Sequence, residues 1–175
     1  MKHELLKGER ILLREMRDED LERIHDWENR SELWYLGDVH EPLSEAEISN
    51  FINHSTGDIY TDGQLRLMID VDDKTIGCID LFEFDKYNQR AGVGILIAES
   101  EDRKLGFAKE ALNVLSNYCF ELLNFKQLYC HITADNKASL QLFKTCKFEQ
   151  TGTNRDWVKK GNVFIDAMFM QRLNG

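Results

Sequence analysis

The chain has 175 residues, 42% of them hydrophobic, and a single proline, which is typical of one globular domain spanning residues 1–175 with a sizeable core. Its formal net charge of −9 disfavours non-specific binding to nucleic acid or to an anionic membrane and is compatible with a cationic substrate. The sequence has no apolar run of about 18 residues and no apolar core of a signal peptide, so we expect no transmembrane helix.

In the first part of the chain, residues 9–16 predict a strand and residues 18–29 predict a helix with Asp18 as its N-cap. The apolar stretch Trp34–Leu36 is either part of a substrate entrance or a small satellite of the core. Ser44 and Glu47 have the spacing of a capping box, which predicts that a second helix begins there.

The central and C-terminal parts of the chain alternate between strand and helix patterns. In order, we expect strands over 64–71, 75–84 and 89–97, a helix over 105–124, a strand over 128–133, a helix over 136–146, and a hairpin of 148–158 and 162–172. The strand, helix and strand between 93 and 133 form a βαβ unit, so these two strands are expected to be parallel. The predicted fold is a single mixed α/β (α+β) sheet of about seven mostly antiparallel strands with four flanking helices.

Four cysteines occur without the paired spacing of a metal site: Cys78, Cys119, Cys130 and Cys146. We interpret them as reduced thiols, which indicates a cytoplasmic protein. Because Cys130 and His131 are neighbours in a strand pattern, their side chains point to opposite faces and do not ligate one metal ion together. We therefore expect no metal.

The segment Arg103-x-x-Gly106-x-Ala108 lies where an apolar strand leads into the longest helical pattern. Backbone N–H groups are free at a helix start, and the helix dipole adds partial positive charge there. Small residues at 106 and 108 allow a phosphate group to approach the backbone, while Lys104 and Lys109 add charge. The pattern predicts an anion site.

This segment resembles the acetyl-coenzyme A diphosphate signature of the GNAT superfamily of N-acetyltransferases. Two neighbours support the resemblance: Thr75–Leu81 is similar to the family's third strand, and Asp135–Lys144 is similar to its Asn-x-x-Ser/Ala helix. The similarity extends over residues 10–170. Its closest branches are the ribosomal-protein N-terminal acetyltransferases and the bacterial spermidine acetyltransferases.

The resemblance implies that strands 93–97 and 128–133 diverge like a V and that the pantetheine arm of acetyl-CoA lies between them. It also implies that Asn136 reaches the coenzyme in addition to capping its helix. The candidate coenzyme-binding residues are Leu96, Ile97, Arg103, Lys104, Leu105, Gly106, Phe107, Ala108, Asn136, Ser139 and Phe143.

Acetyl transfer to an amine makes three chemical demands. An alkylammonium with a pKa near 10 is only about one-thousandth free amine at neutral pH, so a base or desolvation must help. The tetrahedral oxyanion needs a donor, for which we expect a backbone N–H of Leu96 or Ile97. The departing thiolate needs a proton unless it leaves as the anion.

In many relatives a tyrosine gives that proton, and the matching residue here is Phe143, which has none to give. Glu83, acting through water, and Tyr129 are the candidate catalytic residues. Asp80 is an alternative to Glu83, and the two face opposite ways in an alternating strand. Cys146 shares a helical face with Phe143, although a buried thiol usually serves packing. Either carboxylate is otherwise a solvated charge or a group that positions the substrate.

The expected function is acetyl-CoA-dependent acetylation of a primary amine, with a protein N-terminus and a small amine such as a polyamine both open as acceptors. No dense acidic cluster occurs over residues 34–47, where polyamine enzymes of this kind tend to carry one. The alternative, motivated by Phe143, is a non-catalytic acyl-CoA sensor or partner-binding module. A nucleotide-binding protein is disfavoured because neither glycine-rich nucleotide motif occurs. A homodimer is possible.

Overall fold

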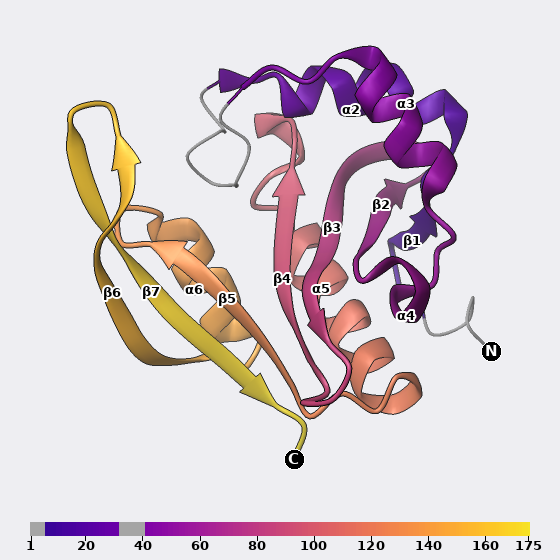
Figure 1. Cartoon of the computed structure of the whole chain (residues 1–175). Coiled ribbons are helices and arrows are strands. Elements are labelled where there is room, and N and C mark those ends of the chain that lie inside the picture. The colour runs from indigo at the N-terminus through magenta and orange to yellow at the C-terminus, as the bar shows by residue number, and fades with distance from the viewer. Residues whose placement is uncertain (1–5, 32–40) are drawn as a thin grey trace.

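The computed structural model describes residues 6–31 and 41–175 (Figure 1). Its seven strands form one sheet in the order β1-β2-β3-β4-β5-β7-β6, and this confirms the predicted mixed sheet of about seven strands. The strands are β1 (Leu12–Glu15), β2 (Leu65–Val71), β3 (Lys74–Asp85), β4 (Arg90–Ile97), β5 (Gln127–Thr133), β6 (Glu149–Lys160) and β7 (Val163–Leu173). The helices are α2 (Leu21–Glu28), α3 (Glu45–His54), α4 (Ile59–Asp62), α5 (Phe107–Asn117) and α6 (Lys137–Thr145). Trp34–Leu36 and most of the segment searched for acidic residues lie outside the described residues.

The strand pairing agrees with the predicted mixture of antiparallel and parallel neighbours. Strands β1 to β4 are each antiparallel to their neighbours; short turns join β2 to β3 and β3 to β4, whereas α2, α3 and α4 lie between β1 and β2 in the chain. Strand β5 is parallel to β4, because α5 carries the chain back across the sheet between them. The β6–β7 hairpin continues the sheet beyond β5 and leans away from β4 (Figure 1).

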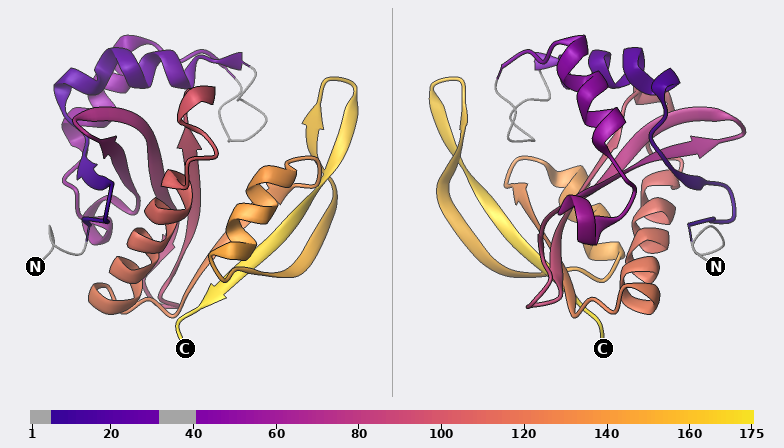
Figure 2. Two further views of the ribbon diagram at one scale, coloured as in Figure 1. Left: turned by 180° about the vertical axis from the view of Figure 1, so that it is seen from behind. Right: turned by 45° about the vertical axis from the view of Figure 1, so that its right-hand side comes forward.

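Successive side chains of a strand point to opposite faces of the sheet, and each face packs in its own hydrophobic cluster. Leu67 of β2 packs in the larger cluster with Leu112 of α5, on the face that α5 and α6 cover (Figure 2, left). Its neighbour Met68 packs in the smaller cluster with Trp27 of α2 and Ile48 of α3, on the opposite face. The pattern of buried residues therefore places α5 with α6 and α2 with α3 on different sides.

Local hydrogen bonds explain where the helices of the first half begin. The capping box of α3 is present, since Glu47 N–H donates to the Ser44 hydroxyl at 3.3 Å and Ser44 N–H donates to the Glu47 carboxylate at 2.8 Å. The prediction of Asp18 as an N-cap is wrong. Asp18–Asp20 form a short 3₁₀ turn before α2, and it is Asp20 whose carboxylate accepts the Arg17 N–H at 2.9 Å.

The longest predicted helix, over 105–124, is divided in the structure. Leu105 and Gly106 belong to the preceding turn, because Gly106 has a φ of +90° and cannot continue the helix backwards. The α-helix ends at Asn117 and continues as a π-helical turn over Tyr118–Leu122. A further short helix, α4, lies just before β2, where no helix is expected from the sequence.

A buried ionic cluster fixes β1 against β2 and the entry to α2. Arg14 donates to Asp20 at 2.7 Å and to Asp70 at 2.6 Å, and the Asp20 side chain is fully buried. Burial of Asp20 favours its neutral form, but the hydrogen bonds from Arg14 and from the Arg17 N–H outweigh this and lower its pKa. The cluster is structural.

The described residues contain no helix that could cross a membrane, no disulfide and no cluster of metal-binding side chains. None of the helices in residues 6–31 and 41–175 is long and apolar enough to cross a membrane. The four cysteines are buried and form no disulfide, and Cys130 is buried where His131 is exposed, so their side chains do point to opposite faces. Across the same two segments, no three or more His, Cys, Asp or Glu side chains gather in a way that could hold a metal ion.

Candidate active site

The two central strands, β4 and β5, separate along their length. Only three residue pairs join them in parallel register: Arg90–Gln127, Ala91–Leu128 and Gly92–Tyr129. Beyond these pairs β4 continues to Ile97 beside β3 alone, and β5 continues to Thr133 beside β7 alone. The predicted splay is therefore confirmed. Its closed end lies at Gly92 and Tyr129, and its open end lies at Ile97 and Thr133 (Figure 1).

The edge of β4 that faces this gap carries free backbone groups. Ala98 N–H donates to the carbonyl of Ile76 at 3.0 Å, which fixes the phase of the β3–β4 ladder. Backbone groups alternate in direction along a strand, so those of Leu96 face β3, whereas the odd-numbered residues of Val93–Ile97 face the gap. Of the two expected oxyanion donors, Ile97 thus directs its N–H toward the gap. A peptide-like arm can pair with this edge as an added strand.

The turn into α5 presents a row of unpaired backbone N–H groups. Among the described residues, the N–H groups of residues 104–109 have no hydrogen-bond acceptor. This is ordinary for the first turn of a helix, and the α5 dipole adds partial positive charge at the same place. The turn meets the requirements of a diphosphate site, as the motif predicts.

Arg103, the arginine of the motif, donates hydrogen bonds to two backbone carbonyl groups at the end of β4. Its Nε donates to the carbonyl of Ile97 at 3.0 Å and its Nη2 donates to the carbonyl of Ala98 at 2.8 Å. Arg103 therefore fastens the loop to the end of β4. The neighbouring Lys104 is exposed and adopts a φ of +62°, so its ammonium group stays at the surface.

A second arginine at this turn comes from a distant part of the sequence. Arg10 Nη1 donates to the carbonyl of Leu105 at 3.0 Å, and Arg10 Nε pairs with Glu110 at 3.1 Å. Its guanidinium lies 4.8 Å from the centre of the Phe107 ring. A Cβ at Gly106 would lie 3.0 Å from Arg10 Nη2, the movable end of that side chain, so it is the φ of +90° that mainly restricts this position to glycine. No local sequence signal indicates this contact.

The two candidate catalytic side chains meet at the closed end of the gap. The β3–β4 register shifts between Phe82 and Asp85, where Glu83 adopts a φ of +49°. Across β4, Tyr129 Oη donates a hydrogen bond of 2.6 Å to Glu83 Oε2. A side chain at Gly92, between them, would lie 2.3 Å from the Phe82 ring, so only glycine fits on the intervening strand.

The environment of Tyr129 keeps its proton in place at neutral pH. Burial is the largest cause, and with the hydrogen bond to Glu83 it raises the pKa of Tyr129 well above its ordinary value. The pair therefore combines a protonated phenol with a carboxyl group that accepts its hydrogen bond. Such a pair can take up one proton and release another.

Asp80, the alternative carboxylate, is already engaged. Arg66 Nε and Nη2 donate to its two oxygens at 2.7 and 2.9 Å, and the same guanidinium pairs with Glu28 of α2. This bidentate arrangement ties α2 to the sheet and satisfies the Asp80 carboxylate. Glu83 has no such cationic partner among the described residues.

Of the residues of α6 that the sequence predicts to be functional, some lie at the start of the helix and others are buried in the core. Asn136 is the N-cap, as expected, and its side chain accepts the N–H of Ser139 at 3.1 Å. Phe143 is 3% exposed, and its ring packs edge-on against Phe148 at a centroid distance of 5.0 Å. Cys146 is also buried, with its thiol 3.8 Å from the carbonyl of Lys109. Neither Phe143 nor Cys146 presents a polar group to the gap.

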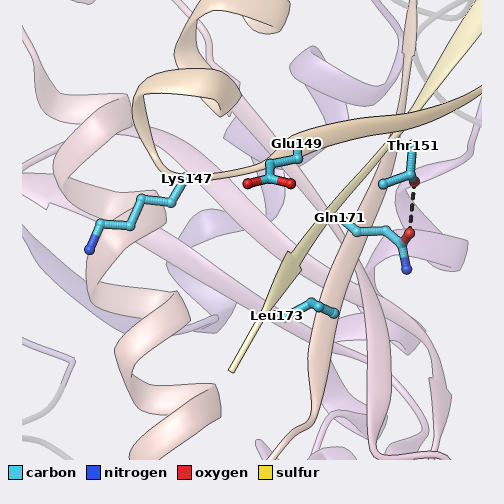
Figure 3. Close-up of a pocket in the computed structure, with 5 residues that line it drawn as sticks. All are labelled: Lys147, Glu149, Thr151, Gln171 and Leu173. Carbon is cyan, nitrogen blue, oxygen red and sulfur yellow. Dashed lines mark hydrogen bonds between the residues drawn. The ribbon is translucent and has the colours of Figure 1, made fainter. Parts of the chain in front are cut away.

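A separate shallow pocket of about 190 Å³ lies on the β6–β7 hairpin (Figure 3). It is lined by Lys147, Glu149, Thr151, Gln171 and Leu173, and the Thr151 hydroxyl donates to Gln171 at 2.7 Å. The lining includes neither the turn into α5 nor the pair formed by Tyr129 and Glu83. We therefore assign no part of the reaction to this pocket.

A splayed parallel strand pair beside an anion-binding helix start, on a seven-stranded sheet of this order, defines an acetyltransferase of the GNAT class. The family model described as an acetyltransferase (GNAT) domain matches residues 10–149, and the chain belongs to that family. Membership confirms the expected reaction class, acetyl-CoA-dependent acetylation of an amine, and supports an enzyme over a non-catalytic acyl-CoA sensor.

Individual relatives are similar over most of their length. The spermidine N(1)-acetyltransferase of Vibrio cholerae is 26% identical over 145 residues, which cover 81% of this chain and 80% of the relative. An uncharacterised N-acetyltransferase of Bacillus licheniformis, p20, is 25% identical and covers 97% of this chain and 96% of its own. The first relative is a spermidine acetyltransferase, which is one of the two branches that the sequence suggests, whereas the name of the second indicates no branch.

Solved structures share the fold. The Vibrio cholerae spermidine N-acetyltransferase, crystallised with CoA and spermine, superposes with a TM-score of 0.83 at 24% identity and covers 94% of this chain and 96% of that chain. A dodecameric structure of the spermidine N-acetyltransferase from the same organism gives a TM-score of 0.79 at 25% identity, with 94% of each chain covered.

Proposed function

We propose that this acetyltransferase acts on a primary amine of a small polycation, a diamine or polyamine. The meeting of Tyr129 and Glu83 at the closed end of the gap is the observation that carries the proposal, since in the described part of the chain Glu83 has no cationic side chain as partner and can serve a reacting amine there. The net charge of −9 and the similarity to a spermidine acetyltransferase support a cationic acceptor over a protein N-terminus.

In this proposal the diphosphate of acetyl-CoA binds the N–H groups of residues 104–109 at the turn into α5. The residues of that turn include Arg103, Lys104, Leu105, Gly106, Phe107 and Ala108. The pantetheine arm follows the free edge of β4 toward Gly92, a path of about 13–17 Å at about 3.3 Å per residue. Asn136 and Ser139, at the start of α6, border the coenzyme from the β5 side.

The proton path uses the pair at the closed end. A neutral amine attacks the thioester carbon, and the oxyanion that forms accepts a hydrogen bond from a backbone N–H on the free edge of β4 close to Gly92, of which Val93 is the nearest odd-numbered residue, whereas Ile97 lies too far along the strand at the open end. Glu83 takes the proton from the new ammonium through water, the carbon–sulfur bond breaks, and Tyr129 protonates the departing sulfur. Glu83 then returns its proton to Tyr129, so the net change moves one proton from nitrogen to sulfur.

The function is tested by measuring the release of free thiol from acetyl-CoA with a panel of acceptors. The panel contains diamines, polyamines, monoamines and peptides with free N-termini. The proposal expects the highest kcat/KM with diamines or polyamines. A peptide N-terminus that is acetylated faster than every polyamine would contradict the proposed acceptor, and the absence of turnover with the whole panel would contradict the enzyme.

We also propose that the chain self-associates and resides in the cytoplasm. Val163 and Phe164, at the tip of the β6–β7 hairpin, are 59% and 57% exposed, which is unusual for large apolar side chains and suits contact with a second copy. The four buried, unbridged thiols suit a reducing compartment. Light scattering of the purified chain tests the first proposal, and a mass near 20.5 kDa would contradict it.

A further inference from the structure

Four aromatic side chains lie in a continuous row on β5, β7 and β6. Ring centroids are 5.7 Å apart for Tyr129 and Phe169, 4.9 Å for Phe169 and His131, and 6.5 Å for His131 and Trp157, whose planes are nearly parallel at 21°. We call Tyr129, His131, Phe169 and Trp157 the aromatic row.

The aromatic row lies on the sheet face opposite α5. Leu128 and Cys130 of β5 point into the core cluster that includes α5, so Tyr129 and His131, which alternate with them, point to the other face. The row begins at Tyr129, the residue that binds Glu83, and follows the β6–β7 hairpin away from the closed end of the gap. It is therefore continuous with the proposed reaction site.

The far end of the row is open to solvent. Trp157 is 61% exposed and His131 is also exposed, whereas Tyr129 and Phe169 are partly buried. An indole that is stacked on one neighbour and otherwise uncovered presents a free aromatic surface. Aromatic faces carry negative potential and attract ammonium groups within about 6 Å of the ring centre.

Resting on the proposed function, we propose that the aromatic row binds the second ammonium group of the acceptor and so selects diamines and polyamines over monoamines. The reacting amine must be neutral beside Glu83, whereas a second amine with a pKa near 10 stays charged. The uncharged end is then presented to the thioester while the charged end lies over Trp157 and His131.

The test compares a diamine long enough to span the row, 1,8-diaminooctane, with the short monoamine 1-aminobutane, which does not reach Trp157 from the reaction site. We expect Trp157→Ala to raise KM for the diamine about threefold to tenfold, as loss of one cation–π contact implies, with kcat unchanged. The KM for the monoamine should not change. Trp157→Phe keeps an aromatic face and should restore most of the diamine affinity.

Tyr87→Ala is the matched control, because Tyr87 is an aromatic residue with 94% exposure in the β3–β4 turn, outside the row. It should leave both KM values unchanged, and thermal unfolding should show that Trp157→Ala folds normally. Higher ionic strength should raise the KM of the wild type for the diamine more than for the monoamine.

Two results would overturn the inference while leaving the proposed function intact. One is equal KM for diamine and monoamine in the wild type, and the other is a Trp157→Ala variant that weakens both acceptors alike, as expected if the row serves contact with another protein copy. A wild type that acetylates no amine at all would instead overturn the proposed function, and the inference with it.

Discussion

The phenol of Tyr129 on β5 donates a hydrogen bond of 2.6 Å to Glu83 on β3, across the intervening strand β4. This contact depends on three local features: the register break after Phe82, the positive φ of Glu83, and the absence of a side chain at Gly92. It places a proton donor and a carboxyl group together at the end of the gap, on the opposite side of the site from Phe143. The proposed proton path therefore needs no tyrosine on α6.

Removing either member of this pair should slow the chemical step. We expect Glu83→Gln and Tyr129→Phe each to lower kcat about 100-fold, with the Kd for acetyl-CoA within about twofold of wild type. Because the residues act as a unit, the double variant should be little worse than either single one. Stopped-flow and steady-state thiol assays measure the effect.

The matched control for these variants is Glu149→Gln, in the pocket of the β6–β7 hairpin (Figure 3). It removes a carboxylate of the same kind from a site to which we assign no chemistry, and kcat should stay at the wild-type value. Retention of full kcat by both Glu83→Gln and Tyr129→Phe would refute the proposed proton path.

A tyrosine introduced on α6 at position 143 should not act as a proton donor in the reaction. The Phe143 ring is buried against Phe148, so a hydroxyl added by Phe143→Tyr enters the core, where an unpaired hydroxyl costs about 1–3 kcal/mol. We expect lower stability in urea unfolding and no recovery of kcat in the Phe143→Tyr, Tyr129→Phe double variant. A recovery above tenfold would show that position 143 reaches the thioester.

A carboxylate in the turn into α5 should abolish coenzyme binding. Gly106→Glu places negative charge and bulk beside the free N–H groups of residues 104–109, where the diphosphate is proposed to bind. Gly63→Glu is the control, since Gly63 also has a positive φ, +71°, but a Cβ there meets nothing within 4 Å. Isothermal calorimetry with CoA should show no binding for the first variant and wild-type binding for the second. Equal binding by both would argue against this site.

The two basic residues of the motif should contribute unequally. Arg103 holds the carbonyls of Ile97 and Ala98, whereas Lys104 offers only a screened surface charge. We expect Arg103→Gln to weaken CoA binding about tenfold, because it frees the loop, and Lys104→Gln to weaken it less than threefold. The reverse order would mean that charge, not the shape of the loop, dominates.

The buried cluster around Asp20 should make stability depend on acid pH. Its pKa is lowered in the folded state, so the ionised form stabilises the fold above the unfolded value near 4, and this contribution is lost as the pH falls through the lower, folded value. Asp20→Asn leaves Arg14 without its buried counter-charge and should cost about 3 kcal/mol at pH 6. Urea unfolding at pH 6 and pH 3 should show that the difference in free energy of unfolding between variant and wild type becomes smaller at the lower pH. A difference that becomes larger at pH 3 would contradict a lowered pKa of Asp20.

Features encoded by short sequence patterns were predictable. The capping box at Ser44 and the alternation of β2, β3 and β4 depend on residues within a few positions of one another. The helix start at Gly106 depends on a local glycine, and the parallel direction of β4 and β5 follows from the single helical crossover that connects them. These local rules were sufficient for the fold and for the position of the turn at which we propose that the diphosphate binds.

Features that depend on tertiary contacts were not predictable. Arg10 meets Leu105 and Glu110 from 95 and 100 residues away, so no window of sequence reveals it. The bulge at Glu83 breaks the strand alternation on which its orientation was predicted, and only the fold shows that Tyr129 lies opposite. Asp18 looked like a helix cap, but contacts with Arg14 and Arg17 give that place to Asp20.

The most direct test of the account is a crystal structure of the chain with bound CoA. The account predicts diphosphate oxygens within about 3.2 Å of backbone N–H groups of residues 104–109, and a pantetheine arm paired with the odd-numbered residues of Val93–Ile97. Its sulfur should lie near Tyr129 and Glu83. A coenzyme bound on the β6–β7 hairpin, or a gap between β4 and β5 that closes in its presence, would contradict the account.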